Sequence, residues 1–181
     1  MAKPFISKNN PFNENPNEGE IFSLSYIMPK YWITWIFLGL SFVVAHLPFF
    51  TKKFLGEMIG KILYRFNSQK KKIIEINLCL SFNKISNSEI DKITRKFFTN
   101  LGHMYISLPS LWWKSDITIQ KSIKKQNLEY IDNTLANNQS VILLAPHTLS
   151  LDYGGRALSE YNLLSMYKPF KNNLLNWFIG K

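Results

Sequence analysis

The sequence predicts an α/β fold, in which a membrane helix and a helical region precede an α/β domain. Three observations predict it: an uncharged stretch from Tyr31 to Phe50, apolar stripes at helical spacing after it, and a continuous apolar run over 141–145 that ends at Pro146. Continuous apolar runs are typical of buried parallel strands. We therefore expect four segments: a disordered tail (1–29), a transmembrane or membrane-anchoring helix (30–50), a basic amphipathic helical region (51–115) and the N-terminal part of an α/β domain (116–181).

The composition indicates a basic protein with enough apolar residues for a core. Of 181 residues 46% are hydrophobic, and the formal net charge is +10. Such a charge suits an anionic partner, namely a nucleic acid, a lipid head-group surface or an acidic protein, although lysines on solvated faces explain it as well. Cys79 is the single cysteine and only three histidines are present, so an internal disulfide is excluded and a zinc site is not expected.

The stretch from Tyr31 to Phe50 contains no Asp, Glu, Lys or Arg. A helix that spans a bilayer needs about 20 mostly apolar residues, and Trp32 and Trp35 lie at one end, as aromatic residues do at a membrane interface. A buried core helix is the alternative, because His46 and Pro48 weaken the apolar character. Lysine and arginine gather on the C-terminal side of the stretch, which predicts a main body in the cytoplasm.

Two helical stripes follow. The first has apolar residues at Phe54, Leu55, Met58, Ile59, Ile62, Leu63 and Phe66, with lysines mostly off that face. Such a helix lies against an anionic bilayer or packs as an ordinary surface helix, and this segment alone fits both. The second runs from Ile90 to Leu108; we expect Ser88 and Asp91 to form a capping box at its start and Pro109 to end it.

The remaining segments predict alternating strands and helices. Residues 117–123 alternate as a strand does, 127–138 favour a short helix, 141–145 a buried strand, 163–167 a further strand and 172–180 a helix. His103, on the second stripe, is expected to pack or to face solvent. We expect Trp112 and Trp113 to anchor a core or an interface.

A histidine and an aspartate follow the apolar run. His147 comes directly after Pro146, and Asp152 lies five positions later. In open α/β sheets, sites form beyond the carboxyl ends of strands. Histidine is a good general base, and a carboxylate can hold its second ring nitrogen. A solvent-facing pair is the ordinary alternative, because this spacing also occurs by chance.

Several segments in order resemble one enzyme family. They are "YWITWIFLGL", "LPFF", "GKILYRF", "INLCLSF", "WW", "VILLAPHTLSLDYGGR" and "MYKPFKNNLLNW". Together they resemble the lipid A late acyltransferases, of lauroyl and myristoyl transferase type, which belong to the glycerolipid acyltransferases with a His-x4-Asp/Glu box. The resemblance implies an inner-membrane enzyme that faces the cytoplasm and moves a fatty acyl chain from acyl carrier protein to a hydroxyl of a lipid A precursor in lipopolysaccharide synthesis, with no metal or other cofactor.

The resemblance also implies roles for individual residues. His147 matches the catalytic base and Asp152 its acidic partner, where many of these enzymes have Glu. Arg156 matches an arginine that follows the box. Four more residues match a Tyr-Arg-Pro…Asn element, with lysine in place of arginine; they are Tyr167, Lys168, Pro169 and Asn172. Arg156, Tyr167, Lys168 and Asn172 are thus the expected substrate-binding residues, although Arg156 also fits a surface arginine and Asn172 a helix cap.

Two departures from the family pattern concern specificity and length. Leu149 stands where the glycerol-phosphate branch has serine, which favours the lipid A branch. The resembled family runs to about three hundred residues, so we expect this chain to be a truncated or frame-shifted product, with a glycerolipid-acyltransferase-like α/β domain that is incomplete at its C-terminus. The expected partners are acyl carrier protein, a lipid A precursor and an anionic membrane surface. The alternatives are a related phospholipid or glycolipid acyltransferase, a non-catalytic membrane remnant and a nucleic-acid binder, for which no motif is present.

Overall fold

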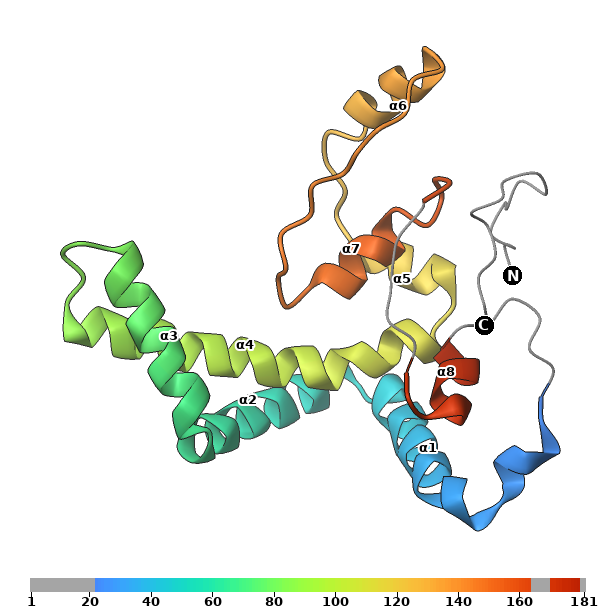
Figure 1. The fold of residues 1–181 in the computed structure, drawn as a ribbon, viewed down its shortest axis with the longest axis horizontal. Helices are drawn as coiled ribbons and strands as arrows, with labels where there is room; N and C mark the ends of the chain where they lie inside the picture. Colours follow the sequence, from blue (N-terminus) through green and yellow to red (C-terminus); the bar gives the residue numbers. More distant parts are fainter. Residues whose placement is uncertain (1–21, 164–169, 180–181) are drawn as a thin grey trace. The chain divides into compact units, whose positions relative to one another are not determined.

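The computed structural model describes residues 22–163 and 170–179, and this part of the chain is helical, with no strand (Figure 1). The predicted α/β fold is therefore wrong for the described residues. Two 3-10 turns, η1 (Leu24–Ile27) and η2 (Pro29–Tyr31), lie within or next to the predicted tail. The helices are α1 (Trp32–His46), α2 (Phe49–Phe66), α3 (Ser68–Ser81), α4 (Asn87–Trp113), α5 (Asp116–Ser122), α6 (Glu129–Ala136), α7 (Leu151–Ala157) and α8 (Asn173–Ile179).

The helices form two compact units. The first contains the chain up to Phe42, Leu111–His147 and the residues from Leu151 onward; the second contains Val43–Ser110 with Thr148–Ser150. Helix α4 passes from the second unit into the first.

The expected strand over 141–145 is an extended segment without a ladder. A strand needs a neighbouring strand for its backbone groups, and the described residues offer none. Ile142 and Leu144 are accordingly 95% and 98% exposed. The further strand expected over 163–167 lies almost wholly outside the described residues.

The other expected strand, over 117–123, is helix α5. The Ser115 side chain accepts a hydrogen bond from the Thr118 backbone N–H at 3.4 Å and so caps the helix, while Asp116 lies in its first turn. This local start signal overrides the apolar alternation that predicted a strand.

The predicted membrane helix is also wrong. Among the described helices, none has both the length and the apolar character that crossing a bilayer would require. Pro48 divides the uncharged stretch, because proline lacks a backbone donor and disfavours helix in the residue before it. Helix α1 therefore ends at His46 after 15 residues, a length of about 22 Å against a hydrocarbon core of about 30 Å.

Aromatic side chains build the core of the first unit. Tyr26, Tyr31, Leu38 and Leu174 are buried together, and Trp113, Leu175, Trp177 and Phe178 pack against them. The Trp113 indole N–H donates to Ser41 Oγ at 2.7 Å. The centroids of the Trp113 and Phe178 rings lie 4.7 Å apart. The prediction that the tryptophan pair anchors a core is confirmed for Trp113.

Three glycines let α2 and α4 pack closely within the second unit. A methyl group on Gly60 would lie 2.7 Å from the Phe98 carbonyl oxygen, and one on Gly102 would lie 2.6 Å from the Gly60 nitrogen. Gly56 lies against His103, so this histidine packs in the helix crossing. The two backbones approach more closely than any larger residue would allow.

The ends of α4 differ from expectation. The capping box is formed by Ser86 and Glu89, two residues before the predicted pair: Ser86 Oγ accepts from the Glu89 N–H at 3.3 Å, and Glu89 Oε2 accepts from the Ser86 N–H at 3.0 Å. Pro109 does not end the helix, which continues to Trp113. Ser110 and Leu111, directly after the proline, are buried, so packing holds the last turn in place.

Candidate functional site

His147 and Asp152 lie on either side of the turn that leads into α7. His147 ends the extended segment and Asp152 is in the first turn of the helix, and both side chains are exposed. Within the described part of the chain, no hydrogen bond or ion pair joins them. The structure therefore places the predicted pair next to one turn without bringing the two side chains into contact.

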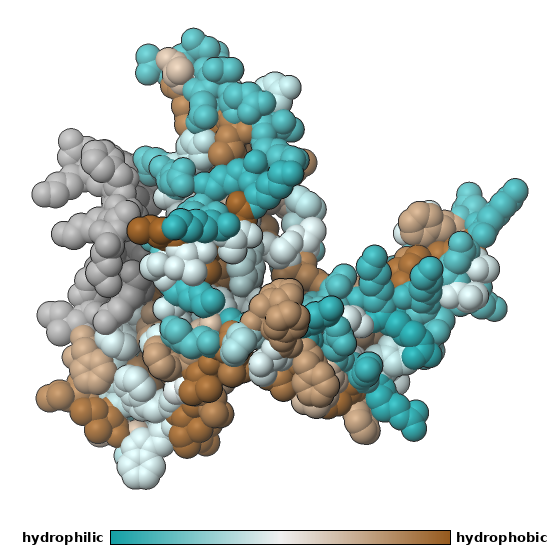
Figure 2. Space-filling view, turned by 180° about the vertical axis from the view of Figure 1, so that it is seen from behind, coloured by the Kyte–Doolittle hydropathy of each residue, from teal (hydrophilic) through white to brown (hydrophobic). Residues whose placement is uncertain are grey.

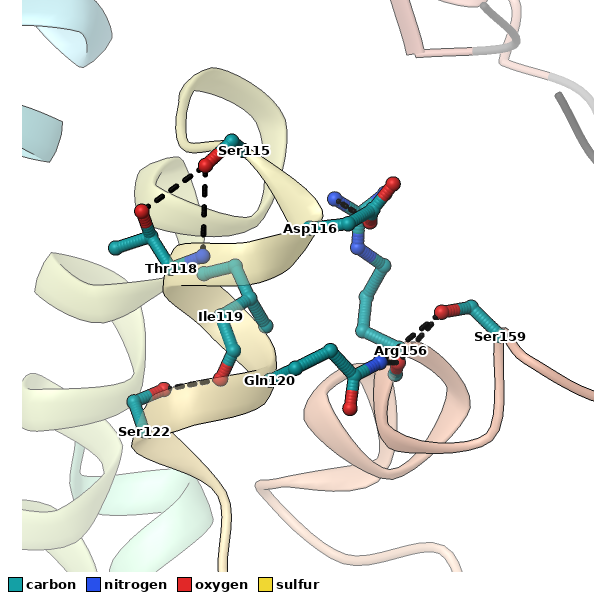
Figure 3. Close-up of polar contacts among 8 residues, drawn as sticks. All are labelled: Ser115, Asp116, Thr118, Ile119, Gln120, Ser122, Arg156 and Ser159. Carbon is teal, nitrogen blue, oxygen red and sulfur yellow. Dashed lines mark hydrogen bonds and ion pairs between the residues drawn. The ribbon is translucent and has the colours of Figure 1, made fainter. Parts of the chain in front are cut away.

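Arg156, one turn along α7, is held by α5 (Figure 3). Its Nη2 lies 2.7 Å from Asp116 Oδ1 in an ion pair, and the Gln120 amide donates to the Arg156 carbonyl oxygen. Gln120 Nε2 also lies 3.1 Å from Ser159 Oγ, just beyond the end of α7. We call these contacts of Asp116, Gln120, Arg156 and Ser159 the α5–α7 clasp.

The clasp leaves two buried polar atoms without partners in the described structure, Arg156 Nε and Gln120 Oε1. An unpaired buried donor or acceptor costs about 1–3 kcal/mol, so the clasp is not a fully satisfied structural network. It fixes the helix that carries Asp152 and Arg156.

Sequence reasoning missed Asp116 and Gln120, because it assigned 117–123, which contains Gln120 and directly follows Asp116, to a strand. The Ser-Asp pair at 115–116 is a common helix start, and this signal could have located α5. Nothing in the linear sequence indicates that α5 faces α7.

The other predicted substrate-binding residues divide into two groups. Tyr167 and Lys168 lie outside the described residues. Asn172 caps α8: its Oδ1 accepts from the Leu175 N–H at 3.1 Å, and its Nδ2 donates to Thr34 Oγ1 of α1 at 2.7 Å. Both polar atoms of the Asn172 side chain are thus engaged within the protein, which confirms the capping alternative.

A separate polar cluster joins the helices of the second unit. Asp91 accepts hydrogen bonds from Arg95 Nε at 2.7 Å and from the Tyr64 hydroxyl at 2.6 Å. These bonds, the one from Arg95 first, lower the pKa of Asp91. Lys71 and Arg95 both lie over the Tyr64 ring, at 4.6 and 4.5 Å from its centroid. The cluster ties α2, α3 and α4 together.

A groove lies at the corner between α3 and α4. It has a volume of about 730 Å³, and its lining includes Phe82, Lys84, Ile85, Lys92, Ile93 and Lys96. Glu89, also in the lining, points its carboxylate back to Ser86. Hydrogen bonds from the Ser86 backbone N–H and hydroxyl lower the pKa of Glu89. Among the described residues, none of the three lysines forms an ion pair.

No metal site is indicated by the described side chains: within residues 22–163 and 170–179, no three His, Cys, Asp or Glu residues gather closely enough to hold an ion.

Comparison with known proteins relates the chain to one family over most of its length. The family model described as "Bacterial lipid A biosynthesis acyltransferase" matches residues 20–181. The Escherichia coli (strain K12) lipid A biosynthesis palmitoleoyltransferase is 29% identical over 157 residues, which are 86% of this chain and 51% of that protein.

Other relatives give the same picture. The lipid A biosynthesis lauroyltransferase of Escherichia coli (strain K12) is also 29% identical over 157 residues, 86% of this chain and 51% of its own length. A lipid A biosynthesis acyltransferase of Haemophilus influenzae (strain ATCC 51907 / DSM 11121 / KW20 / Rd) is 25% identical over 158 residues, 86% of this chain and 50% of its own length. The chain spans about half the length of these relatives. No solved structure matches it significantly.

Proposed function

Because the chain belongs to the bacterial lipid A biosynthesis acyltransferase family, we propose that it transfers a fatty acyl chain from acyl carrier protein to a hydroxyl of a lipid A precursor in lipopolysaccharide synthesis. The observation that carries the proposal is the family match over residues 20–181, which includes the His147-x4-Asp152 box.

The proposed chemistry is a direct transfer. His147 takes the proton of the acceptor hydroxyl, and the oxygen attacks the carbonyl carbon of the donor thioester. The carbon–sulfur bond then breaks, and the imidazolium returns its proton to the departing sulfur. Asp152 orients the imidazole and stabilises its charged form, which requires the turn at 148–150 to bring the two side chains together when substrate binds.

Arg156 is proposed to bind acceptor phosphate together with Lys168. Arginine pairs well with phosphate because its N–H groups form a fork. In the structure Asp116 holds one end of this fork, so phosphate would share the guanidinium with Asp116 or displace it. The α5–α7 clasp supports the proposal because it holds Arg156, and with it the helix that also carries Asp152, against α5.

We further propose that the chain works at an anionic membrane surface, on the side that faces the cytoplasm. Helix α1 exposes Ile33, Ile36 and Leu40 by 81%, 63% and 62%, and α2 exposes Phe50 and Phe54 by 82% and 67%. Hydrophobic side chains cover much of the surface over α1 in Figure 2. Apolar helix faces with a net charge of +10 suit binding in the head-group region of an anionic bilayer.

The direct test is transfer by the purified chain. The chain is incubated with acyl-loaded carrier protein and either a lipid A precursor or a phospholipid, and the masses of the products are measured by mass spectrometry. We expect the lipid A precursor to gain one acyl chain, and we expect His147→Ala to abolish the gain while His46→Ala retains it. Transfer to the phospholipid alone would support the related phospholipid enzyme instead. Transfer retained by His147→Ala would refute the assignment of the base, and no transfer to either acceptor would refute the proposed activity.

A further inference from the structure

The groove between α3 and α4 combines an apolar lining with a basic rim. Phe82 and Ile93 are 56% and 41% exposed and Ile85 is half-buried, so the groove offers apolar surface to a partner. Lys84, Lys92 and Lys96 line the same groove and are exposed. Within the described residues none of these lysines forms an ion pair. Lys92 interacts electrostatically with the Glu89 carboxylate, so the charges of Lys84 and Lys96 are the ones most available to a partner from outside.

The spacing of the lysines matches an acidic helix. Lys92 and Lys96 lie one turn apart on α4, a rise of about 6 Å. Carboxylates three or four residues apart on a partner helix have nearly the same spacing. A groove lined by apolar side chains can receive the apolar face of such a helix. A bilayer is flat, so it suits the exposed faces of α1 and α2 and does not fit a concave groove.

We infer that this groove, formed by Phe82, Ile85 and Ile93 with Lys84, Lys92 and Lys96 around them, is a docking surface for an acidic amphipathic helix of a partner protein. The inference rests on the proposed function, in which that partner is the acidic carrier protein that brings the acyl chain. Docking through the lysines would speed encounter and make binding weaken with salt.

The test compares two triple variants of the full chain. One combines Lys84→Gln, Lys92→Gln and Lys96→Gln; the matched control combines Lys70→Gln, Lys72→Gln and Lys124→Gln, which are exposed lysines outside the groove lining. Both remove three positive charges. Titration calorimetry with carrier protein that lacks an acyl chain measures the dissociation constant, and thermal melts show that each variant folds.

We expect the groove variant to bind the carrier protein about tenfold more weakly than wild type, since each rim pair contributes a few-fold. The control should stay within about twofold, because its lysines lie outside the interface. Equal loss in both variants, loss in neither, or no binding by wild type would overturn the inference. If the groove variant loses binding to phosphatidylglycerol vesicles and keeps the carrier protein, the groove binds lipid and the inference is wrong. Should the triple variant fail to melt cooperatively, Lys92→Gln with Lys96→Gln replaces it.

Binding and transfer separate the inference from the proposed function. Docking through the groove without any transfer would refute the proposed function and leave the inference standing. Transfer by the groove variant with an unchanged KM for the carrier protein would refute the inference alone.

Discussion

At the scale of single residues, Asp91 shows how one carboxylate links two helices, α2 and α4. Its hydrogen bonds to Arg95 and Tyr64 favour the charged form and lower its pKa from the ordinary value of 3.8. A lowered pKa in the folded state stabilises the fold above the unfolded value, and this contribution disappears as the pH falls through the folded value. The Asp91 contribution is therefore complete at neutral pH and is lost in acid.

Asp91→Asn should lower the melting temperature at pH 7 and have a progressively smaller effect below pH of about 4. Thermal melts of both proteins across this range measure the difference. Glu57→Gln is the control, because Glu57 has no hydrogen bond or ion pair within the described part of the chain. A difference between Asp91→Asn and wild type that stays constant down to pH 2 would contradict the role given to these hydrogen bonds.

Asp116 is expected to stabilise α7 through its ion pair with Arg156. Asp116→Asn removes the charge that holds Arg156, and a partly exposed ion pair is worth about 1 kcal/mol or less. Backbone amides of α7 should exchange with solvent about two- to fivefold faster, as measured by hydrogen exchange. Glu129→Gln, at an exposed carboxylate of α6, should leave α7 unchanged. Unchanged exchange in Asp116→Asn would show that the ion pair does not hold the helix.

At the scale of elements, the capping box fixes where α4 begins. Ser86→Ala removes the hydroxyl that accepts from Glu89 and should cost about 1 kcal/mol of unfolding free energy. Ser88→Ala, at the capping position that the sequence predicted, should change stability by less than about 0.5 kcal/mol. Urea denaturation of both variants measures the costs. A larger loss for Ser88→Ala would place the cap where the sequence predicted it.

The crossing of α2 and α4 depends on glycine. A methyl group at Gly60 meets the backbone of Phe98 and Thr99, neither of which can move alone. Gly60→Ala should therefore destabilise the second unit by about 1–3 kcal/mol or more. Gly39→Ala in α1 meets nothing within 4 Å and should be neutral or stabilising by about 0.5–1 kcal/mol. Thermal melts compare the two, and equal stability would mean that the helices do not pack this closely.

Comparing the predicted elements with the structure shows which of them follow from local sequence. The apolar stripe over Phe54–Phe66 and the helices over 127–138 and 172–180 are confirmed, because helical periodicity is a local property. The strands predicted over 117–123 and 141–145 were wrong, because apolar periodicity does not show whether a neighbouring strand is present or whether a helix cap overrides the pattern. The site was predicted residue by residue from the family motif, whereas the partners of Arg156 depend on how α5 meets α7. Their identity could not come from linear spacing.

At the scale of the whole molecule, apolar surface and positive charge occur together. Each unit exposes large hydrophobic side chains, among them Ile33 and Ile36 in the first unit and Phe50 and Phe54 in the second. A protein with only a basic surface would leave an anionic bilayer at high salt, because exposed charges are screened. A protein that also inserts apolar side chains should stay partly bound.

Vesicle binding tests this combination. The chain should bind vesicles that contain phosphatidylglycerol and keep part of that binding at about 1 M salt, where screening reduces the reach of a charge to about 3 Å. Ile33→Ser with Ile36→Ser should lower the affinity for the vesicles about tenfold, because each serine buries less apolar area in the bilayer than isoleucine does. Ile117→Ser with Ile142→Ser, at isoleucines that are 69% and 95% exposed outside α1, is the matched control for a general loss of exposed apolar surface. If salt alone releases the chain completely, or if the control and the α1 variant lose binding equally, α1 does not lie in the head-group region, and the basic charge is its only attraction to the membrane.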